Sequence, residues 1–470
     1  MVKNRRDFLK MSGLGLGVAT GFASNLASFN AFGADTTDYK ALVCVFLRGG
    51  MDSNDLIIPY DRASSIAYES IRAPLLDQYA AEGFASRRKS RLLRLQGIDG
   101  DVKSAAGPAD GREFAFPEEM RELRDLYREM KVAIVGNVGP LVEPTSAAGY
   151  NAANAKLPAR LFSHNDQESM WMASNPQAAA SGWGGRFGDI MQAAKENRFS
   201  SFTSVSTSGN RVFANGITSG GFILSDNGVE QIQEMKSNNS FGKKLSNAKY
   251  NAHSKHDNIS PRKLQNTSNS NVYDNLYLQE VFAKSADVVT AFPSSSLGVQ
   301  LATVAKMISN RSMLGMRRQI FIVTDNGYDS HSLQARRLPA KQAIVAKAMA
   351  AFYKEMKAQG IENNVTQFTA SDFGRTLVPN ANGTDHGWGS HHLVLGGAVN
   401  GGKFYGEIPE AALNHSQDAG RGRLIPQVSV DEYAYSLGRW FGLRPTEAID
   451  ALPNVNNFNR RSLRNMLPWS

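Results

Sequence analysis

The sequence predicts an α/β fold in which a mainly parallel β-sheet is sandwiched between helices. Short β-rich runs recur along the 470 residues, and each run leads into a polar turn. Several runs are apolar at successive positions, as expected of strands that are covered on both faces. Helical segments lie between the runs, and this alternation is typical of a parallel sheet with helices on both sides.

Five runs are predicted to be strands of this sheet. They are residues 41–47, 132–135, 319–323, 365–370 and 392–395. The polar residues that follow them belong to loops far apart in the sequence, which meet only if the fold brings the strand ends together. Because α/β enzymes build their sites from such loops, we expect one site at this edge of the sheet.

Two segments carry a clear helical pattern. Residues 118–130 place apolar side chains at three- and four-residue spacing after Pro117, a residue that suits a first helical turn. Residues 340–356 carry a second stripe, formed by Val345, Met349, Phe352 and Met356. We interpret both as helices whose apolar stripes belong to the protein core.

Two polar stretches are predicted insertions into one large domain that spans residues 38–470. Residues 85–112 are basic and Gly-rich, whereas residues 237–270 are rich in Asn, Ser and Lys and have little apolar surface to bury. His253 and His256 lie in the second stretch, where the polar context favours a surface loop over a metal site. Nothing between these stretches resembles a linker between domains.

Residues 1–33 resemble a twin-arginine signal peptide. The run Asn4-Arg5-Arg6-Asp7-Phe8-Leu9-Lys10 fits its pattern, a Gly-rich apolar stretch follows, and Ala31 and Gly33 offer a cleavage site. The resemblance implies export to the periplasm by the twin-arginine machinery, a route compatible with a bound metal. The alternatives are an ordinary basic start or an uncleaved anchor, but the Gly content is high for a membrane span, so we expect no stable anchor.

The net charge indicates the class of partner, and the cysteine content excludes an internal disulfide. The formal net charge is +9, and about +6 remains without the signal segment, an excess that favours anionic substrates. The basic run at residues 87–94 lacks interleaved aromatics, so we interpret it as a solvated face rather than a nucleic-acid contact. The single cysteine, Cys44, cannot form an internal disulfide, and its apolar neighbours predict that it is buried.

Asp and His cluster in the loops that follow the predicted strands. These residue types are ligands of divalent metals and groups for acid-base chemistry. The candidate residues are Asp52, Ser163, His164, Asp329, His331, Asp372, Asp385, His386 and His391. His391 and His392 are neighbours on a predicted strand and point to opposite faces, so at most one of them is expected to reach a site.

The ordered motifs also resemble a known family. They are Phe46-Leu47-Arg48-Gly49-Gly50-Met51-Asp52, Phe162-Ser163-His164-Asn165-Asp166-Gln167, Gly327-Tyr328-Asp329-Ser330-His331, Ser371-Asp372-Phe373-Gly374-Arg375 and Thr384-Asp385-His386-Gly387-Trp388-Gly389. From residue 41 to the C-terminus the chain resembles the exported bacterial family called domain of unknown function 1501. That family is grouped with the alkaline phosphatase and sulfatase superfamily, which implies an alkaline phosphatase-like fold.

The resemblance implies a metal site at the strand ends. Two divalent metals about 4 Å apart are typical of the superfamily, and zinc, manganese, calcium and magnesium are candidates here. The implied metal ligands are Asp52, Asp329, His331, Asp372, Asp385, His386 and His391. Ser163 or His164 takes the nucleophile position. Phe373 stands where the superfamily has a His, so the site is expected to bind a single metal, a harder metal, or none.

Each candidate residue also has a structural interpretation. Asp52 suits a helix cap, Ser163 suits a turn, and Arg48 and Arg375 are either anion-binding residues or members of structural salt bridges. Two functional hypotheses therefore remain open. One is a periplasmic, metal-dependent hydrolase or transferase of a phosphate or sulfate ester, with a small anionic ester or a glycan as substrate. The other is a catalytically degenerate periplasmic binding or assembly protein.

Overall fold

The computed structural model describes residues 38–84, 87, 89–96, 110–175, 179–209, 211–225, 274–460 and 462–469. The predicted signal peptide, residues 1–33, lies outside the described residues. So does the predicted insertion at residues 237–270 with His253 and His256, and most of the insertion at residues 85–112. A search of the described helices finds none with the length and apolar character needed to cross a membrane.

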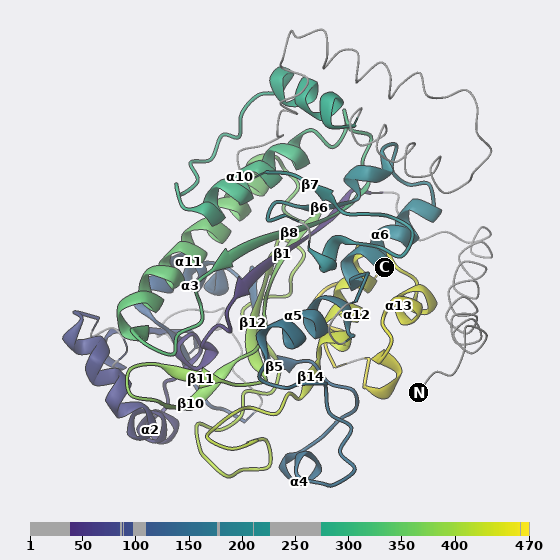
Figure 1. Cartoon of the computed structure of the whole chain (residues 1–470). Helices are drawn as coiled ribbons and strands as arrows, with labels where there is room; N and C mark the ends of the chain where they lie inside the picture. The colour runs from purple at the N-terminus through teal and green to yellow at the C-terminus, as the bar shows by residue number, and fades with distance from the viewer. Residues whose placement is uncertain are drawn as a thin grey trace, which may run out of the picture.

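A nine-stranded sheet forms the centre of the molecule (Figure 1). Its order is β13-β5-β12-β9-β1-β8-β6-β7, and β14 also pairs with β5. The strands are β1 (Lys40–Arg48), β5 (Val132–Gly139), β6 (Ser204–Ser206), β7 (Phe222–Ile223), β8 (Arg318–Asn326), β9 (Val365–Ser371), β12 (Ser390–Gly396), β13 (Lys403–Gly406) and β14 (Val428–Ser429). In the described sheet β12 runs antiparallel to its neighbours and the other pairings are parallel. The predicted mainly parallel sheet is confirmed.

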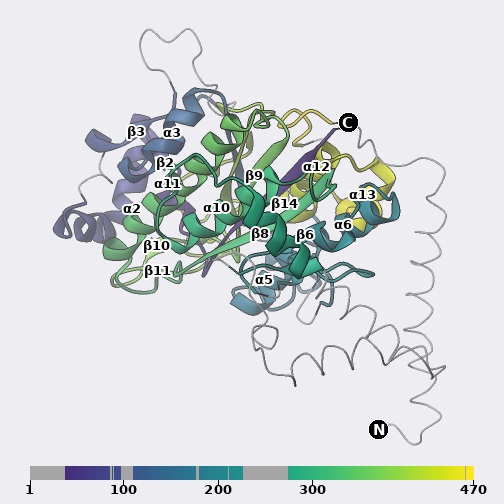
Figure 2. The same cartoon turned by 90° about the horizontal axis from the view of Figure 1, so that it is seen from above.

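Helices cover both faces of this sheet, as Figures 1 and 2 show. One layer contains α3 (Arg121–Arg128), α10 (Ser296–Ser309) and α11 (Gln334–Ala358). The other contains α5 (His164–Ala173), α6 (Trp183–Ala193), α12 (Val430–Phe441) and α13 (Pro445–Ala451). The predicted helix at residues 118–130 begins as the 3-10 turn η4 (Glu118–Met120) and continues as α3, and residues 340–356 lie within α11.

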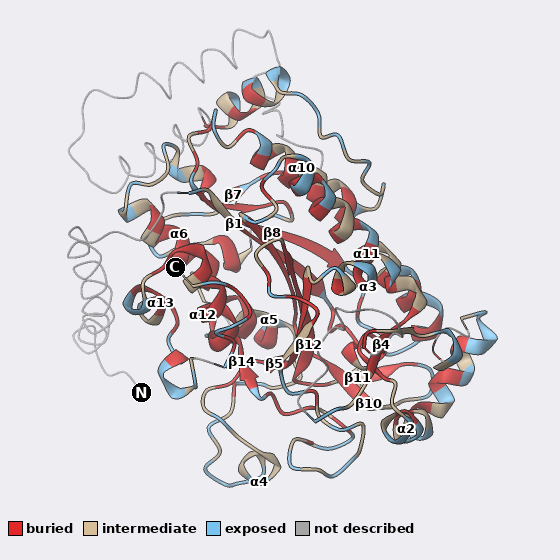
Figure 3. Cartoon of the chain, turned by 180° about the vertical axis from the view of Figure 1, so that it is seen from behind, coloured by how far each residue is buried: buried red, intermediate tan, exposed pale blue. Residues whose placement is uncertain are grey.

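The central strand β1 explains why the apolar residues are consecutive. Ala41, Val43, Val45 and Leu47 pack with the α10–α11 layer, whereas Leu42, Cys44 and Phe46 pack with the α6–α12 layer. Successive side chains of a strand point to opposite faces, so a strand covered on both sides needs apolar residues at every position. Figure 3 shows the sheet buried between helices with exposed outer faces. Cys44 is buried, as predicted.

Smaller elements lie beside the sheet. They are α2 (Arg62–Ala81), α4 (Ala147–Tyr150), the hairpin of β10 (Arg375–Pro379) and β11 (Thr384–His386), the sheet of β2 (Ile58–Pro59), β4 (Phe114–Phe116) and β3 (Leu93–Arg94), and the 3-10 turns η1 (Ser53–Asp55), η3 (Lys89–Arg91), η5 (Ser200–Phe202), η6 (Val212–Ala214) and η7 (Val455–Asn457). The parallel strands β1, β8 and β9 end together, at Arg48, Asn326 and Ser371. The loops that leave this edge carry the candidate residues.

Candidate functional site

Four elements bring the His and Asp clusters together at the carboxyl edge of the sheet. Asp329 lies in the loop after β8, and Asp372 directly follows β9. His164 is the first residue of α5, and His386 ends β11, where it pairs with Arg375 of β10. Residues more than 200 positions apart therefore meet at one place, as expected of an α/β strand-end site.

Three imidazoles converge on one carboxylate oxygen. Asp329 Oδ1 lies 3.6 Å from His164 Nε2, 3.3 Å from His331 Nε2 and 3.4 Å from His386 Nε2. Two atoms that each lie about 2.0–2.1 Å from a tetrahedral zinc are about 3.3–3.4 Å apart, so these are separations of ligands around one metal. In the described part of the chain, His164, Asp329 and His386 form a group with all ligand atoms within 4.8 Å of one another.

The second nitrogen of each imidazole is held by an oxygen. His164 Nδ1 lies 2.7 Å from Asp372 Oδ2, His386 Nδ1 lies 2.7 Å from the carbonyl oxygen of Phe162, and His331 Nδ1 lies 3.4 Å from Asp385 Oδ1. A carboxylate or a carbonyl can only accept, so in the neutral imidazole each Nδ1–H donates and Nε2 is left as the nitrogen that can bind a metal. Metal-binding histidines are oriented by outer partners in this way.

His331 and His386 approach each other unusually closely. Their Nε2 atoms are 2.7 Å apart. Two lone pairs at that separation repel unless a proton or a cation lies between them. Burial lowers the pKa of His386, and the nearby charge of Arg375 lowers it further, so His386 is the neutral imidazole that a metal requires.

Arg375 fixes the position of Asp329. Its Nη2 donates to Asp329 Oδ1 at 2.6 Å, and the buried guanidinium also donates to the carbonyl oxygens of Gly50 at 2.9 Å and Thr384 at 2.8 Å. Burial acts to raise the pKa of Asp329, but the hydrogen bond and charge of Arg375 lower it below its ordinary value. Arg375, a predicted anion-binding residue, therefore donates its hydrogen bonds to other groups of the protein.

The cluster is open to solvent on one side. The exposed fractions of the side chains are 50% for Asp329, 45% for His331, 30% for His164 and 23% for His386. A structural metal site is usually closed by four protein ligands, whereas a catalytic site keeps a position for water or substrate. This half-exposed arrangement leaves room for such a position.

The floor of the cluster is apolar and tightly packed. The buried ring of Phe373 lies 4.6 Å, between ring centroids, from both His164 and His386. Gly49 has φ +116°, and a Cβ at this position would lie 2.5 Å from the backbone nitrogen of Asp329. Glycine is required here because the β1 and β8 loops approach too closely for a side chain.

Asp52 lies in a separate buried network. Its carboxylate accepts from Arg72 of α2 at 2.5 Å and from Gln334 at 2.6 Å, and Asp52 caps η1 by accepting from the backbone nitrogen of Asn54. Burial raises the pKa of Asp52, and the charge of Arg72 opposes that rise. The fold does not bring Asp52 into the group of imidazoles around Asp329.

The remaining predicted residues lie beside the cluster or away from it. Ser163 precedes α5, and its hydroxyl donates to Asp166 Oδ2 at 2.7 Å. Asp385 accepts from Asn380 at 3.0 Å and forms an ion pair with Arg421 at 3.3 Å. His391 is buried in β12, where its Nδ1 accepts from the backbone nitrogen of Asn137 at 2.9 Å. His392 is buried in the same strand.

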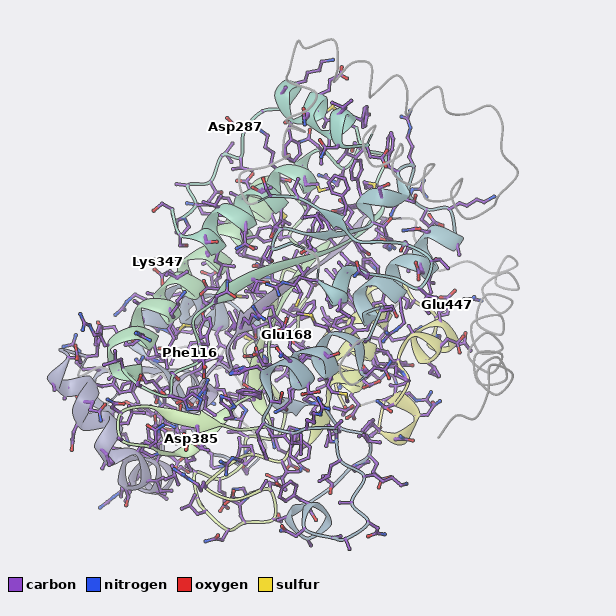
Figure 4. All side chains as sticks on the ribbon, in the orientation of Figure 1. Phe116, Glu168, Asp287, Lys347, Asp385 and Glu447 are labelled. Atoms are coloured by element: carbon purple, nitrogen blue, oxygen red, sulfur yellow. The ribbon has the colours of Figure 1, made fainter. Side chains whose placement is uncertain are left out.

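Two charged residues beside the cluster were not among those predicted from sequence. Glu168 of α5 forms ion pairs with Arg48 at 2.9 Å and with Arg211 at 3.4 Å. Figure 4 labels Glu168 and Asp385, which mark the α5 and β11 sides of this region. Glu168 is four residues after His164, the spacing of neighbours on a helix face, and this signal identifies it. No sequence pattern singles out Arg211.

Comparisons with solved structures find low similarity. A protein named i-CgsB, in complex with a neocarrahexaose, is 8% identical with a TM-score of 0.34, over 90% of this chain and 78% of that chain. The lipooligosaccharide phosphoethanolamine transferase A of Neisseria meningitidis is 9% identical with a TM-score of 0.32, over 97% of this chain and 64% of that one. A Bacteroides thetaiotaomicron protein, described with its metabolism of multiple glycosaminoglycans, is 10% identical with a TM-score of 0.28, over 80% and 70%.

All three TM-scores lie below 0.5. A comparison with curated proteins finds no significant match. A family profile, by contrast, matches residues 39–452, which include every residue of the cluster. The chain belongs to the family described as "Protein of unknown function (DUF1501)".

Proposed function

We propose that the protein is a metal-dependent hydrolase or transferase of phosphate or sulfate esters. One divalent metal would be held by His164, Asp329 and His386, with His331 beside them. The observation that carries the proposal is the convergence of three Nε2 atoms on Asp329 while an oxygen holds each Nδ1. A divalent metal in such a site acts as a Lewis acid and lowers the pKa of bound water.

The donor set favours particular metals among the candidates. Two imidazoles and one carboxylate suit zinc, a borderline metal, better than the harder cations. Calcium and magnesium prefer oxygen ligands, and the cluster offers few of them. We therefore propose zinc ahead of manganese, calcium and magnesium.

Positive charge around the ligands supports an anionic substrate. Arg423 donates to the carbonyl oxygen of His386 at 2.9 Å, and Arg421 pairs with Asp385. Together with the bound cation, these guanidinium groups favour a negatively charged ester, either a small molecule or a glycan. The family grouping with phosphatases and sulfatases is consistent with a phosphoryl or sulfuryl centre.

Metal content is the test of this function. Protein purified without added metal or a metal-affinity tag is analysed for its elements, and its melting temperature is measured with zinc, manganese and a chelator. A metal at 100 times its dissociation constant stabilises by about 2.7 kcal/mol, about 3 °C for a chain of this size. The His386→Ala variant should lose both the metal and the shift. The control His415→Ala, outside the cluster, should keep both.

Ester turnover separates the enzyme from the second candidate function, a binding protein. The Ser163 hydroxyl donates to Asp166 in the first turn of the helix that follows it, and this observation favours a site that binds without a serine nucleophile. Metal-dependent hydrolysis of 4-nitrophenyl phosphate or sulfate, lost in His386→Ala, supports the enzyme. A metal-loaded protein that turns over none of a broad ester panel supports the binding protein.

We also propose that residues 1–33 direct the folded protein to the periplasm through the twin-arginine machinery. The paired arginines Arg5 and Arg6 carry this proposal. Cell fractionation of the Arg5→Lys, Arg6→Lys double variant should find the protein retained in the cytoplasm. Equal periplasmic amounts of both forms would contradict it.

A further inference from the structure

A pair of arginines lies beside the cluster and shares one carboxylate. Arg48 Nε donates to Glu168 Oε2 at 2.9 Å, and Arg211 Nη1 donates to Glu168 Oε1 at 3.4 Å. Both oxygens of Glu168 are used, one by each guanidinium. Glu168 therefore holds the two guanidinium groups in place, and the carboxylate of Asp372 also acts on Arg211.

The pair adjoins the proposed metal ligands through backbone and helix. The carbonyl oxygen of Arg48 accepts from the backbone nitrogen of Tyr328, next to Asp329. The backbone nitrogen of Gly49, which follows Arg48, donates to Asp372 Oδ1 at 3.0 Å, and the other oxygen of Asp372 holds His164. Glu168 lies one helical turn after His164. The two arginines thus flank the cluster on its α5 side.

Unused hydrogen-bonding capacity remains in the pair. The side chain of Arg48 is 44% exposed, although its Nε is bound to Glu168. Arg211 is more buried, and its Nε has no hydrogen-bond partner among the described residues. That Nε is closed off from solvent, so the exposed side chain of Arg48 is the part of the pair that a ligand meets first. Forked guanidinium groups match the oxygens of carboxylate, phosphate and sulfate.

We propose that Arg48 and Arg211 bind a second anionic group of the substrate, distinct from the ester group at the metal. The inference rests on the proposed function and adds to it the substrate class. That class is an ester which carries another phosphate, sulfate or carboxylate, as a multiply charged sugar or glycan does. The ester lies toward His164 and Asp329, and the second anion lies toward Glu168.

A purely structural ion pair is the alternative, and the chain supplies a matched control for it. Arg317 precedes β8 at the opposite edge of the sheet and pairs with Glu196 at 3.6 Å. Like Arg48, it is a partly exposed arginine bound to one carboxylate. Arg317→Gln therefore removes the same kind of interaction far from the cluster.

The experiment measures two ligands separately. Equilibrium dialysis of the metal-free protein with labelled sulfate, phosphate or acetate reports the anion site, and zinc binding to the same preparations reports the metal site. We expect Arg48→Gln combined with Arg211→Gln to weaken sulfate or phosphate binding at least about tenfold, since charge-assisted hydrogen bonds are lost, and to keep zinc binding. His386→Ala should lose zinc and keep the anion. Arg317→Gln should keep both.

The possible outcomes distinguish the two proposals. Anion binding that is absent in the wild-type protein, or unchanged in the double arginine variant, overturns the second-anion site whatever the metal result. Loss of the anion in that variant with no zinc bound by wild type supports the anion site and overturns the metal-dependent function. Acetate binding tighter than sulfate and phosphate binding would identify the second group as a carboxylate.

Discussion

Two buried histidines in β12 are expected to make the fold sensitive to acid. His391 Nδ1 accepts from the backbone nitrogen of Asn137, so this ring cannot gain a proton there without breaking that hydrogen bond. His392 is also buried, and its Nε2 has no hydrogen-bond partner among the described residues. Burial lowers the pKa of each imidazole to about 3. Both rings are therefore neutral in the folded protein over the ordinary pH range.

The magnitude follows from proton linkage. An unfolded histidine has a pKa of about 6.5, so between pH 6.5 and 3 the unfolded chain binds more protons than the folded chain. The stabilisation is complete above pH 6.5 and is lost as the pH falls toward 3. The value pH 5 lies about 1.5 units below the pKa of an unfolded histidine, so each imidazole lowers the free energy of unfolding by about 2 kcal/mol at that pH. His391 and His392 together lower the free energy of unfolding by about 4 kcal/mol between pH 7.5 and pH 5.

Urea denaturation at the two pH values measures this difference. The experiment contains a chelator, because metal release also depends on pH. His391→Asn keeps an acceptor for Asn137, and His392→Gln keeps a polar side chain of similar size. Each variant should be less stable at both pH values, but the difference between pH 7.5 and pH 5 should shrink by about 2 kcal/mol for each substitution. An undiminished difference in the double variant would refute the reasoning, and His415→Asn is the control.

Three further predictions concern single side chains. Burial raises the pKa of Asp431 to about 6, so stability should fall by about 2 kcal/mol as the pH rises from 4 to 6, and urea denaturation of Asp431→Asn should show that this fall has disappeared. Asp372→Asn should weaken zinc binding about 10- to 100-fold in a chelator competition, since the orienting partner of His164 changes. Gly49→Ala should destabilise the fold by about 1–3 kcal/mol and reduce zinc binding, both measured by thermal shift, because the added Cβ collides with the backbone of Asp329.

Sequence patterns predicted the sheet because burial on both faces leaves a direct mark. Every position of β1 from Ala41 to Leu47 is buried, and such a run is visible without coordinates. The edge at which Asp329 and Asp372 lie was likewise predictable, since parallel strands end together. Local periodicity does not encode how the α5 and β11 segments return to that edge. The convergence of His164, His331 and His386 depends on that return.

The positions of Asp52 and His391 depend on partners that the sequence does not reveal. Asp52 is held by Arg72, from a helix whose docking face is set by tertiary packing. His391 and His392 are neighbours in β12, so their imidazoles lie on opposite faces of the strand. Both are covered by neighbouring layers, so neither reaches the cluster. Motif position alone therefore does not separate a metal ligand from a buried structural residue.

Metal stoichiometry is the sharpest remaining consequence of this arrangement. A second metal beside the first would need further ligands, and Asp52 is the candidate that the family resemblance supplies. Its carboxylate is buried and paired with the guanidinium of Arg72, so a cation already neutralises it. Phe373, which follows Asp372, presents an apolar ring that adds no ligand, and this ring packs against His164 and His386.

We therefore predict one equivalent of metal per chain. Titration of the metal-free protein with zinc should reach a single saturating equivalent, because removing Asp52 from Arg72 would leave a buried charge unpaired at a cost of about 3–5 kcal/mol. Phe373→Leu should keep this stoichiometry, since Leu adds no ligand. Two tight equivalents in the wild-type protein would contradict the argument and would place Asp52, or another carboxylate, at a second metal.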